Sequence, residues 1–317
     1  MNDFFIKDDF PKNQIDFDER FADEQSCIEY LFQCKWPDGF TCDICGHTHY
    51  WKSARGLYIC ARCERHQSIT AGTIFHGTRK KLTIWFKAMW WFTTRRSGVN
   101  AVNLKELLGF GSYETAWVWL QKLRSCTICE DRKTLSVDVE VDEFYIGGKH
   151  KGKRGRGAEH KHSVVVAVER KGKKLGRVRL LVTERCSAGE LIPFVQNNIA
   201  FGSHISTDGW LGYTKLKSLG YGHKQIFQTT TEDKDSVLPG VHLVASLVKR
   251  LLLGTFHGRF EKKYLQKYLD EYVFRFNRRN TKSVGKRFYR IVQQAVKTNP
   301  MPLKNIMCCN IRQLLAN

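Results

Sequence analysis

The chain of 317 residues is long enough for about two domains, and its hydrophobic content of 42% can build a buried core, which excludes a disordered protein. Its 52 lysine and arginine residues against 31 acidic residues give a formal net charge of +21, so we expect a polyanionic partner, with nucleic acid first. No run of 18 apolar residues is present and the acidic start MNDFFIKDDFPKN lacks the regions of a signal peptide, so we expect a cytoplasmic, nucleoid-associated protein without a membrane anchor.

Cysteine spacing is the first informative motif. The chain has eleven cysteines, and in a reducing compartment these are more often metal ligands or buried thiols than disulfides. Four of them form two C-x-x-C pairs, Cys42 with Cys45 and Cys60 with Cys63, separated by fourteen residues. This spacing predicts a zinc ribbon over residues 36–70 in which four thiolates bind one Zn²⁺. Three nearby histidines are alternative ligands for one position.

Helices are expected on both sides of the ribbon. Residues 1–35 are rich in acidic side chains, and we expect a solvated helical leader there. Beyond the ribbon, apolar residues recur at helical intervals at Trp85, Ala88, Met89 and Phe92. Thr83 is a candidate N-cap of this helix. Such a stripe is more typical of a helix core than of a surface that stacks on bases.

Residues 80–130 are expected to form a helical, helix-turn-helix-like DNA-binding region. Two apolar patterns flank the break at Gly109 and Gly111, and Ser112 can cap the second helix. The first pattern consists of Val102, Leu104, Leu107 and Leu108, and the second of Ala116, Trp117, Leu120 and Leu123. In a helix-turn-helix the second helix enters the major groove. An ordinary pair of antiparallel helices is the alternative.

The hydrophobic period changes to two at residue 135. Apolar and polar residues alternate there, with Leu135, Val137, Val139 and Val141 on one side. Further strands are predicted at 163–168, 177–183 and 204–207, and helices at 190–199 and 241–254. Three strands followed by helix, strand and helix predict an α/β domain with a mixed sheet.

Two aspartates lie at the ends of predicted strands. Asp142 is near the end of the first strand, and Asp208 comes directly after the strand 204–207. Two carboxylates at strand ends of one sheet can converge on a divalent cation, and their hard oxygen ligands suit Mg²⁺. Two such ions can activate a water molecule or a 3′-hydroxyl and stabilise a leaving oxygen. Each aspartate taken alone is more often a surface turn residue.

Long motifs in order along the chain resemble a known family. They are WPDGFTCDICG (36–46), LTIWF with GVNAVNLKELLG (82–109), VEVDEFYIGGKHKGKRGRG (139–157), STDGWLGY (206–213), VHLVASLVKRLLLGTFHG (241–258) and YLDEYVFRFNRR (268–279). The chain resembles bacterial insertion-sequence transposases of the ISXO-type, zinc-ribbon group, which are DDE-type enzymes related to the Merlin transposons. The resemblance implies an RNase H-like catalytic domain, expected over 134–300 with a tail at 301–317. It also implies cleavage and transfer of DNA strands at terminal inverted repeats.

The resemblance carries over to individual catalytic positions. The family's first and second catalytic acids fall on Asp142 and Asp208, but His242 stands where a glutamate is expected, with Lys249 seven residues later. The expected third ligand is therefore His242, and Lys249 is expected to contact DNA phosphate. Because imidazole is a softer ligand than carboxylate, Mn²⁺ is a candidate cofactor beside Mg²⁺.

Glu271 is the alternative third ligand. It lies four residues before Arg275 on a predicted helix, and an ion pair at that spacing also accounts for it.

Basic residues complete the expected DNA interface. A glycine-rich stretch after Asp142 carries Lys151, Lys153, Arg154 and Arg156, which we expect to contact phosphates. The expected partners are double-stranded DNA, both inverted-repeat ends and target, and further copies of the chain in a homodimer or higher oligomer, because two ends must be brought together. The alternative function is that of a non-catalytic DNA-binding protein, or an inactive or domesticated transposase derivative.

Overall fold

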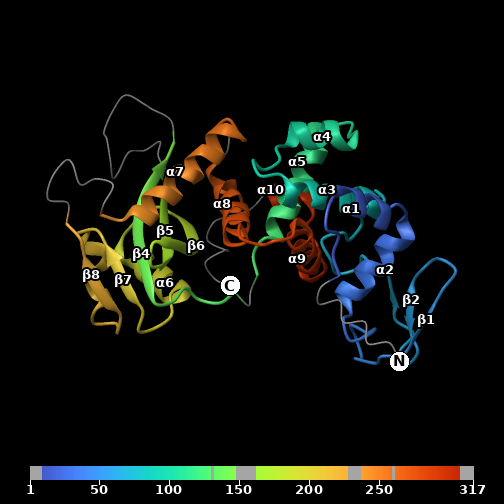
Figure 1. The fold of residues 1–317 in the computed structure, drawn as a ribbon. Helices are drawn as coiled ribbons and strands as arrows, with labels where there is room; N and C mark the ends of the chain where they lie inside the picture. Colours follow the sequence, from blue (N-terminus) through green and yellow to red (C-terminus); the bar gives the residue numbers. More distant parts are fainter. Residues whose placement is uncertain (1–8, 130–131, 148–161, 228–236, 259–260, 308–317) are drawn as a thin grey trace. The chain divides into compact units, whose positions relative to one another are not determined.

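The computed structural model describes residues 9–129, 132–147, 162–227, 237–258 and 261–307. The chain forms two compact units (Figure 1). Unit 1 comprises Met1–Cys129 and Asn280–Cys308, and unit 2 comprises Glu130–Arg279 and Cys309–Asn317. No helix of the described residues combines the length and hydrophobicity that a membrane span requires.

Unit 1 combines a small sheet with helices. The three-stranded antiparallel sheet has the order β1-β2-β3, with β1 at Tyr50–Lys52, β2 at Tyr58–Cys60 and β3 at His66–Gln67. The helices are α1 (Gln14–Arg20), α2 (Glu24–Lys35), α3 (Leu82–Thr94), α4 (Ala101–Leu108), α5 (Tyr113–Ser125), α9 (Val284–Lys297) and α10 (Leu303–Met307).

The N-terminal helices contribute to the core of unit 1, although we expected a solvated leader. Phe17 of α1 stacks on Trp90 of α3 at 4.6 Å between ring centroids and contacts Phe288 of α9 edge-on at 5.4 Å. Phe21 and Tyr30 join the same aromatic cluster. Burial of these large rings stabilises α1 and α2 against α3 and α9. The described acidic side chains of this segment are exposed or half-buried, whereas the apolar faces of α1 and α2 are buried.

The position of α9 also differs from the sequence-based boundaries. We expected the catalytic domain to extend to residue 300, but α9 contacts α2 and α3 in unit 1. Its apolar residues, among them Phe288, Ile291 and Val292, are buried there. The compact unit that contains the large sheet therefore ends near Arg279.

Helix α3 buries the predicted stripe, Trp85, Ala88, Met89 and Phe92, which confirms a core role. Thr83 is not the N-cap; the helix begins after Lys81, which makes no side-chain cap. Instead the carboxylate of Glu24 accepts hydrogen bonds from the backbone N–H groups of Leu82 and Thr83, at 2.8 and 3.3 Å. A residue distant in sequence thus satisfies the helix start.

Helices α4 and α5 form the expected pair around a tight turn. Gly109 ends α4 in the left-handed conformation, with φ of 62°, and Ser112 accepts a hydrogen bond from the Thr115 N–H at the start of α5. Val102 is exposed rather than part of the apolar face of α4. Trp85 of α3 stacks on Trp119 of α5, which buries that part of α5. The described side chains that are exposed on α5 lie in its first turn.

Unit 2 is built on a five-stranded mixed sheet of order β6-β5-β4-β7-β8. The strands are β4 (Asp138–Ile146), β5 (His162–Lys171), β6 (Lys174–Thr183), β7 (His204–Thr207) and β8 (Gly222–Gln225). Strands β4, β5 and β6 are antiparallel neighbours, whereas β7 is parallel to β4 and β8 is parallel to β7. This order and these directions are those of an RNase H-like sheet, as expected.

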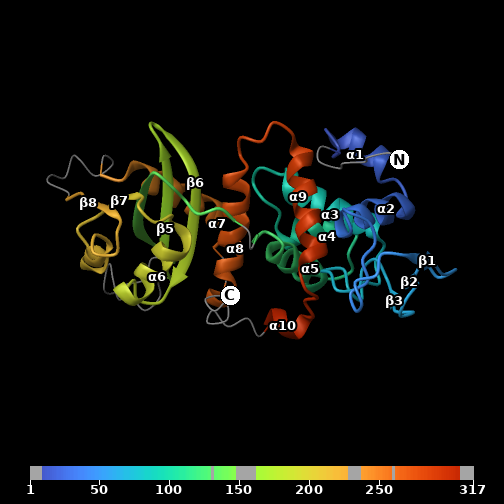
Figure 2. The ribbon, with the colours of Figure 1, turned by 90° about the horizontal axis from the view of Figure 1, so that it is seen from below.

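Helices cover the sheet of unit 2 (Figures 1 and 2). Helix α6 (Ala188–Asn198) packs on one face through Leu191, Phe194 and Val195, which contact alternate valines of β4 and β5. Helix α7 (Pro239–Gly254) lies along β4 and β5, and α8 (Lys262–Asn277) follows β6. The 3₁₀ helix η2 (Leu211–Leu216) follows β7. The run 163–168 is buried on both faces, as its continuous apolar sequence predicts.

Candidate active site and zinc site

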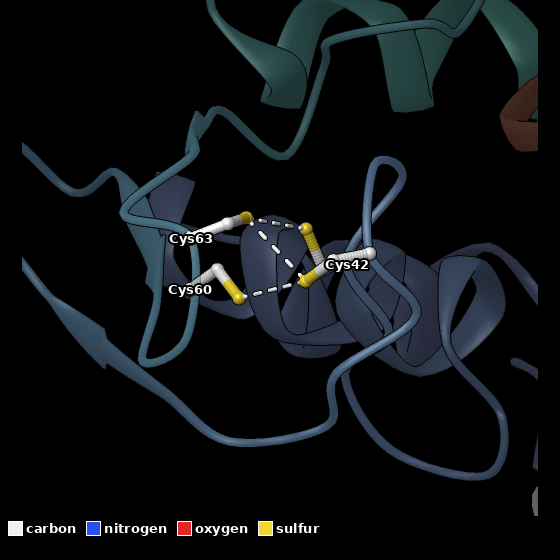
Figure 3. Close-up of side chains that lie close together, drawn as sticks. Cys42, Cys60 and Cys63 are labelled. Atoms are coloured by element: carbon white, nitrogen blue, oxygen red, sulfur yellow. Dashed lines mark hydrogen bonds between the residues drawn. The ribbon is translucent and has the colours of Figure 1, made fainter.

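Four cysteine sulfur atoms converge in unit 1, as the spacing predicts. The Sγ atoms of Cys42, Cys45, Cys60 and Cys63 all lie within 4.8 Å of one another. Cys42 and Cys63 are 3.5 Å apart, Cys45 and Cys60 3.6 Å, and Cys45 and Cys63 3.4 Å (Figure 3). Four thiolates around one zinc at about 2.3 Å would be separated by about 3.8 Å, so the arrangement fits a tetrahedral Zn²⁺ site.

Two matching backbone turns position these sulfur atoms. In the first turn the Cys42 N–H donates to the His47 carbonyl, and in the second the Cys60 N–H donates to the Arg65 carbonyl. The fourth residue after each leading cysteine has a left-handed backbone, Gly46 with φ of 68° and Glu64 with φ of 56°. Glycine is the favourable residue for that conformation, and it occupies only the first turn.

Thiolate formation is favoured at one of the four cysteines. Burial opposes ionisation of Cys60, but the N–H groups of Cys63 and Arg62 and the neighbouring thiols bring its pKa down to about 7. Of the residues that the structure describes, the metal-binding group contains these four cysteines and none of the nearby histidines.

A second group of metal-binding side chains lies in unit 2. Carboxylate oxygens of Asp142, Glu143 and Asp208 lie within 4.8 Å of one another, and all three side chains are half-buried. Asp142 lies in the middle of β4, not near the end of the strand as we expected, and the group arises because β4 is longer than β7. Glu140 is the last β4 residue paired with β7, and Asp208 follows the end of β7 directly. Three carboxylates at this spacing provide the hard oxygen ligands that a divalent cation requires.

The two adjacent acids of β4 come from opposite faces of the sheet. Glu140 and Asp142 share the face of α7, whereas Val141 and Glu143 share the face of α6. The side chains of Asp142 and Glu143 can both reach Asp208 because β7 ends at Thr207. Within the described residues, that side of β4 then has no partner strand beyond Glu140. Strict alternation of faces is the reason that sequence reasoning missed Glu143. Its only sequence signal is the position beside Asp142.

Local hydrogen bonds fix the two aspartates. Oδ1 of Asp142 accepts the N–H of Glu143 at 2.7 Å, and Oδ1 of Asp208 accepts the N–H of Trp210 at 3.0 Å. The hydroxyl of Thr207 donates to the Asp208 carbonyl at 2.8 Å and lies 2.9 Å from Nε2 of His223. Burial lowers the pKa of His223, so its imidazole is neutral at pH 7. These hydrogen bonds therefore fix Thr207 and Asp208 at the end of β7.

Tyr213 of η2 lies on the core side of the carboxylate group. The whole residue is buried among Val141, Leu191 and other apolar residues. Burial, followed by the charges of Glu143, Asp142 and Asp208, raises the pKa of its phenol well above the ordinary value. The hydroxyl consequently keeps its proton and remains a hydrogen-bond donor beside three carboxylates.

Helix α7 carries His242 and Lys249 along β4. The carboxylate of Glu140 accepts the N–H groups of Gly240 and Val241, at 2.7 and 3.1 Å, and so anchors the start of α7. At the other end of the segment, Nζ of Lys249 lies 5.6 Å from the ring centroid of Phe144. Asp142 lies between Glu140 and Phe144 on the same face of β4, so the His242–Lys249 segment runs beside it.

The structure does not bring either candidate third ligand into the carboxylate group. Within the described residues that group consists of Asp142, Glu143 and Asp208, and His242 is exposed on α7 outside it. Glu271 is fully buried and forms an ion pair with Arg275 at 2.8 Å. The basic residues expected after Asp142 lie outside the described part of the chain; they are Lys151, Lys153, Arg154 and Arg156.

Comparisons with known proteins agree with these two sites. The chain matches the ISXO2-like transposase domain over residues 134–277 and the transposase zinc-ribbon domain over residues 22–66, and the two ranges together span more than half of the chain. None of the curated proteins compared with it matches.

Several solved structures are distantly similar. A chain of the simian T-cell lymphotropic virus intasome, in complex with PP2A regulatory subunit B56 gamma, is 15% identical with a TM-score of 0.31. That match covers 54% of this chain and 63%, less than two thirds, of the other. A pre-cleavage Mos1 transpososome is 17% identical with a TM-score of 0.28, covering 70% and 82%. A Mos1 paired-end complex with the left transposon end is 16% identical with a TM-score of 0.27, covering 71% and 82%.

The matched ranges contain both sites. The zinc-ribbon range includes the four converging cysteines, and the transposase-domain range includes the RNase H-like sheet with Asp142 and Asp208. The resemblance noted in the sequence is therefore confirmed, and this chain belongs to the ISXO2-like family of DDE-type transposases.

Proposed function

We propose that this protein binds the terminal inverted repeats of an insertion sequence and catalyses metal-dependent cleavage and transfer of DNA strands. The observation that carries the proposal is the convergence of Asp142, Glu143 and Asp208 at one edge of the sheet, within the range that matches a transposase domain. A net charge of +21 supports DNA as the substrate.

Asp142 and Asp208 are the proposed ligands of divalent cations, Mg²⁺ or Mn²⁺. Ions held there would activate a water molecule or a 3′-hydroxyl for in-line attack on phosphorus and would stabilise the leaving oxygen. The protein's own contribution is positioning: the hydrogen bonds from Glu143 and Trp210 fix one oxygen of each aspartate. Glu143 adds a third carboxylate to the group.

His242 remains the proposed third ligand and Lys249 the proposed phosphate contact. The support is the path of α7, whose start is anchored to Glu140 of β4 and whose Lys249 reaches Phe144 of the same strand. His242 is exposed, so a change of its side-chain rotamer does not disturb the core. A histidine at this place favours Mn²⁺ over Mg²⁺.

Recognition of the DNA ends is assigned to unit 1. The zinc ribbon and the α4–α5 pair are proposed to contact the inverted repeat, with base contacts from the exposed first turn of α5, Ser112, Tyr113 and Glu114. Lys151, Lys153, Arg154 and Arg156 are proposed phosphate contacts. Because two ends must be held together before transfer to target DNA, the active form is proposed to be a homodimer or higher oligomer.

Strand cleavage of a DNA fragment with the element's own ends, in Mg²⁺ and in Mn²⁺, tests this function. Asp142→Asn and Asp208→Asn keep the shape of the side chain, so we expect them to bind the ends as the wild type does while cleavage falls by at least about a hundredfold. His242→Ala should lose most activity and Glu271→Gln should keep it. If His242→Ala cuts normally while Glu143→Gln does not, the third ligand is Glu143.

The second candidate is a non-catalytic DNA-binding protein. The observation in its favour is that His242 replaces the expected glutamate and lies outside the carboxylate group. Wild-type protein that binds the ends tightly but cuts in neither metal would establish this candidate and overturn the first.

A further inference from the structure

An exposed aromatic ring lies next to the carboxylate group. Strand β8 continues its pairing with β7 through the Ile226 N–H, which donates to the Thr207 carbonyl at 2.9 Å, and Phe227 follows. The Phe227 ring lies against the backbone of Gly209, since a Cβ on Gly209 would be 2.5 Å from Cε1 and 2.7 Å from Cδ1 of that ring. Gly209 is the residue directly after Asp208.

Glycine at position 209 serves this close approach. Its φ lies outside the left-handed range, so the backbone conformation itself does not require glycine. The absence of a side chain lets the ring lie directly on the peptide next to Asp208. Although the ring is fixed in this way, Phe227 is 64% exposed, so one of its faces is open to solvent.

A second apolar side chain is exposed shortly after Asp208. Leu211, the first residue of η2, is 72% exposed. Trp210 between them is held by its Nε1–H, which donates to the Cys186 carbonyl at 3.1 Å. An exposed aromatic ring next to the residue that follows Asp208, in a chain of net charge +21, is complementary to a nucleotide, whose phosphate requires cations and whose base has an apolar face.

We propose that Phe227 stacks on a nucleobase adjacent to the scissile phosphate and holds that base out of the duplex during cleavage. The inference rests on the proposed function, because it requires the phosphate to be bound at Asp142 and Asp208. An aromatic platform next to that phosphate compensates for the stacking that a base loses when it leaves the duplex.

Phe201 provides a matched control within unit 2. It is 80% exposed, and its ring lies against a glycine in the same way, with Cε2 2.5 Å from a Cβ built on Gly220. It precedes β7, however, whereas Asp208 follows that strand, so the two rings lie at opposite ends of β7. Substitution of Phe201 reports the effect of removing an exposed ring away from the site.

The test uses full-length protein and duplexes with 2-aminopurine at each position flanking the cleavage site. Wild-type protein with Ca²⁺ is expected to raise the fluorescence at one flanking position, because the base leaves the stack. Phe227→Ala and Phe227→Leu should lose this signal, and their cleavage in Mn²⁺ should fall about tenfold. Phe227→Trp and Phe227→Tyr should restore the cleavage rate, because their rings can stack on the same base, and Phe201→Ala should match the wild type in both measurements.

The outcomes separate this inference from the proposed function. If the wild type cuts the ends and Phe227→Leu gives the same fluorescence and rate, stacking is refuted while the transposase function stands. Loss of cleavage in Phe227→Leu without rescue of the cleavage rate by Trp or Tyr also refutes stacking, because it shows a steric role. If the wild type binds the ends but cuts in no metal, the proposed function fails and this inference fails with it.

Discussion

At the scale of single residues, Tyr213 shows how a buried side chain can support a site without entering it. Its ring belongs to the core below the sheet, and its hydroxyl is the uncharged neighbour of three carboxylates. Three negative charges so close together repel one another, and a donor that keeps its proton lowers that repulsion. A hydrogen-bond donor placed beside metal ligands orients them and tunes their affinity.

Replacement of Tyr213 by phenylalanine tests this role. The ring and its contacts remain, but the donor is lost, so we expect the affinity for Mn²⁺ to fall about tenfold with little change in melting temperature. Titration of Mn²⁺ without DNA, followed by the electron paramagnetic resonance of free Mn²⁺, measures the change. Tyr221→Phe is the control, since that hydroxyl donates to the Ile199 carbonyl in the same core. Equal Mn²⁺ affinity in Tyr213→Phe and the wild type would contradict the role.

At the scale of elements, α8 protects the open edge of the sheet. Among the strands that the structure describes, β6 has a neighbour only on the side of β5, and its other side faces α8. Oε1 of Gln266 accepts the Val182 N–H at 2.9 Å, and Oδ1 of Asn277 accepts the Val178 N–H at 2.8 Å. Amide side chains of one helix thus take the place of a further strand, which prevents pairing with another chain.

Asp270 makes the contact between α8 and β6 dependent on pH. Burial raises its pKa to about 6, against the hydrogen bond from Gln266 and the charges of Arg132 and Lys267. The native state binds the Asp270 proton more tightly than the unfolded chain, in which the pKa is near 3.8. Proton binding therefore stabilises the folded protein fully below about pH 4, and this stabilisation is lost as the pH rises through 6.

Asp270→Asn is therefore expected to raise the free energy of unfolding by about 3 kcal/mol at pH 8 and to change it little at pH 4. Thermal or urea unfolding of both proteins across this pH range measures the difference. The measured quantity is the gain in free energy of unfolding of Asp270→Asn over the wild type at each pH. A gain that is no larger at pH 8 than at pH 4 would be inconsistent with a buried, proton-binding Asp270.

At the scale of the whole molecule, the two metal sites belong to different compact units. The four cysteines lie in unit 1 and the carboxylate group in unit 2, and each unit has its own core. The ribbon contacts α2 of unit 1 through aromatic pairs such as Phe32 with Tyr58. Loss of zinc should therefore disturb end recognition while leaving the carboxylate site intact.

Cys42→Ser tests this separation. We expect the variant to lose its zinc, because the three remaining cysteines do not bind the ion tightly enough to keep the two cysteine turns together. Its affinity for the DNA ends should then fall at least about tenfold. Its Mn²⁺ affinity and the protease resistance of residues 134–279 should match the wild type. Metal analysis, end-binding assays and limited proteolysis measure these properties, with Cys129→Ser, at a cysteine outside the cluster, as the control. A carboxylate site that no longer binds Mn²⁺ would disprove independence of the units.

The sequence by itself determined the features that depend on local spacing. The two C-x-x-C pairs predicted the zinc site, and the alternation around Val139 and Val141 predicted β4, because turn and strand periodicity repeat within a few residues. Asp208 was correctly placed after a strand end, but Asp142 lies in the middle of β4 and was paired with it for a reason, a strand end, that holds only for Asp208. The tertiary structure decided what depends on long-range pairing. Glu143 joins the carboxylates only because β7 ends early, and α1, α2 and α9 share a core because rings distant in sequence meet, which no local period encodes.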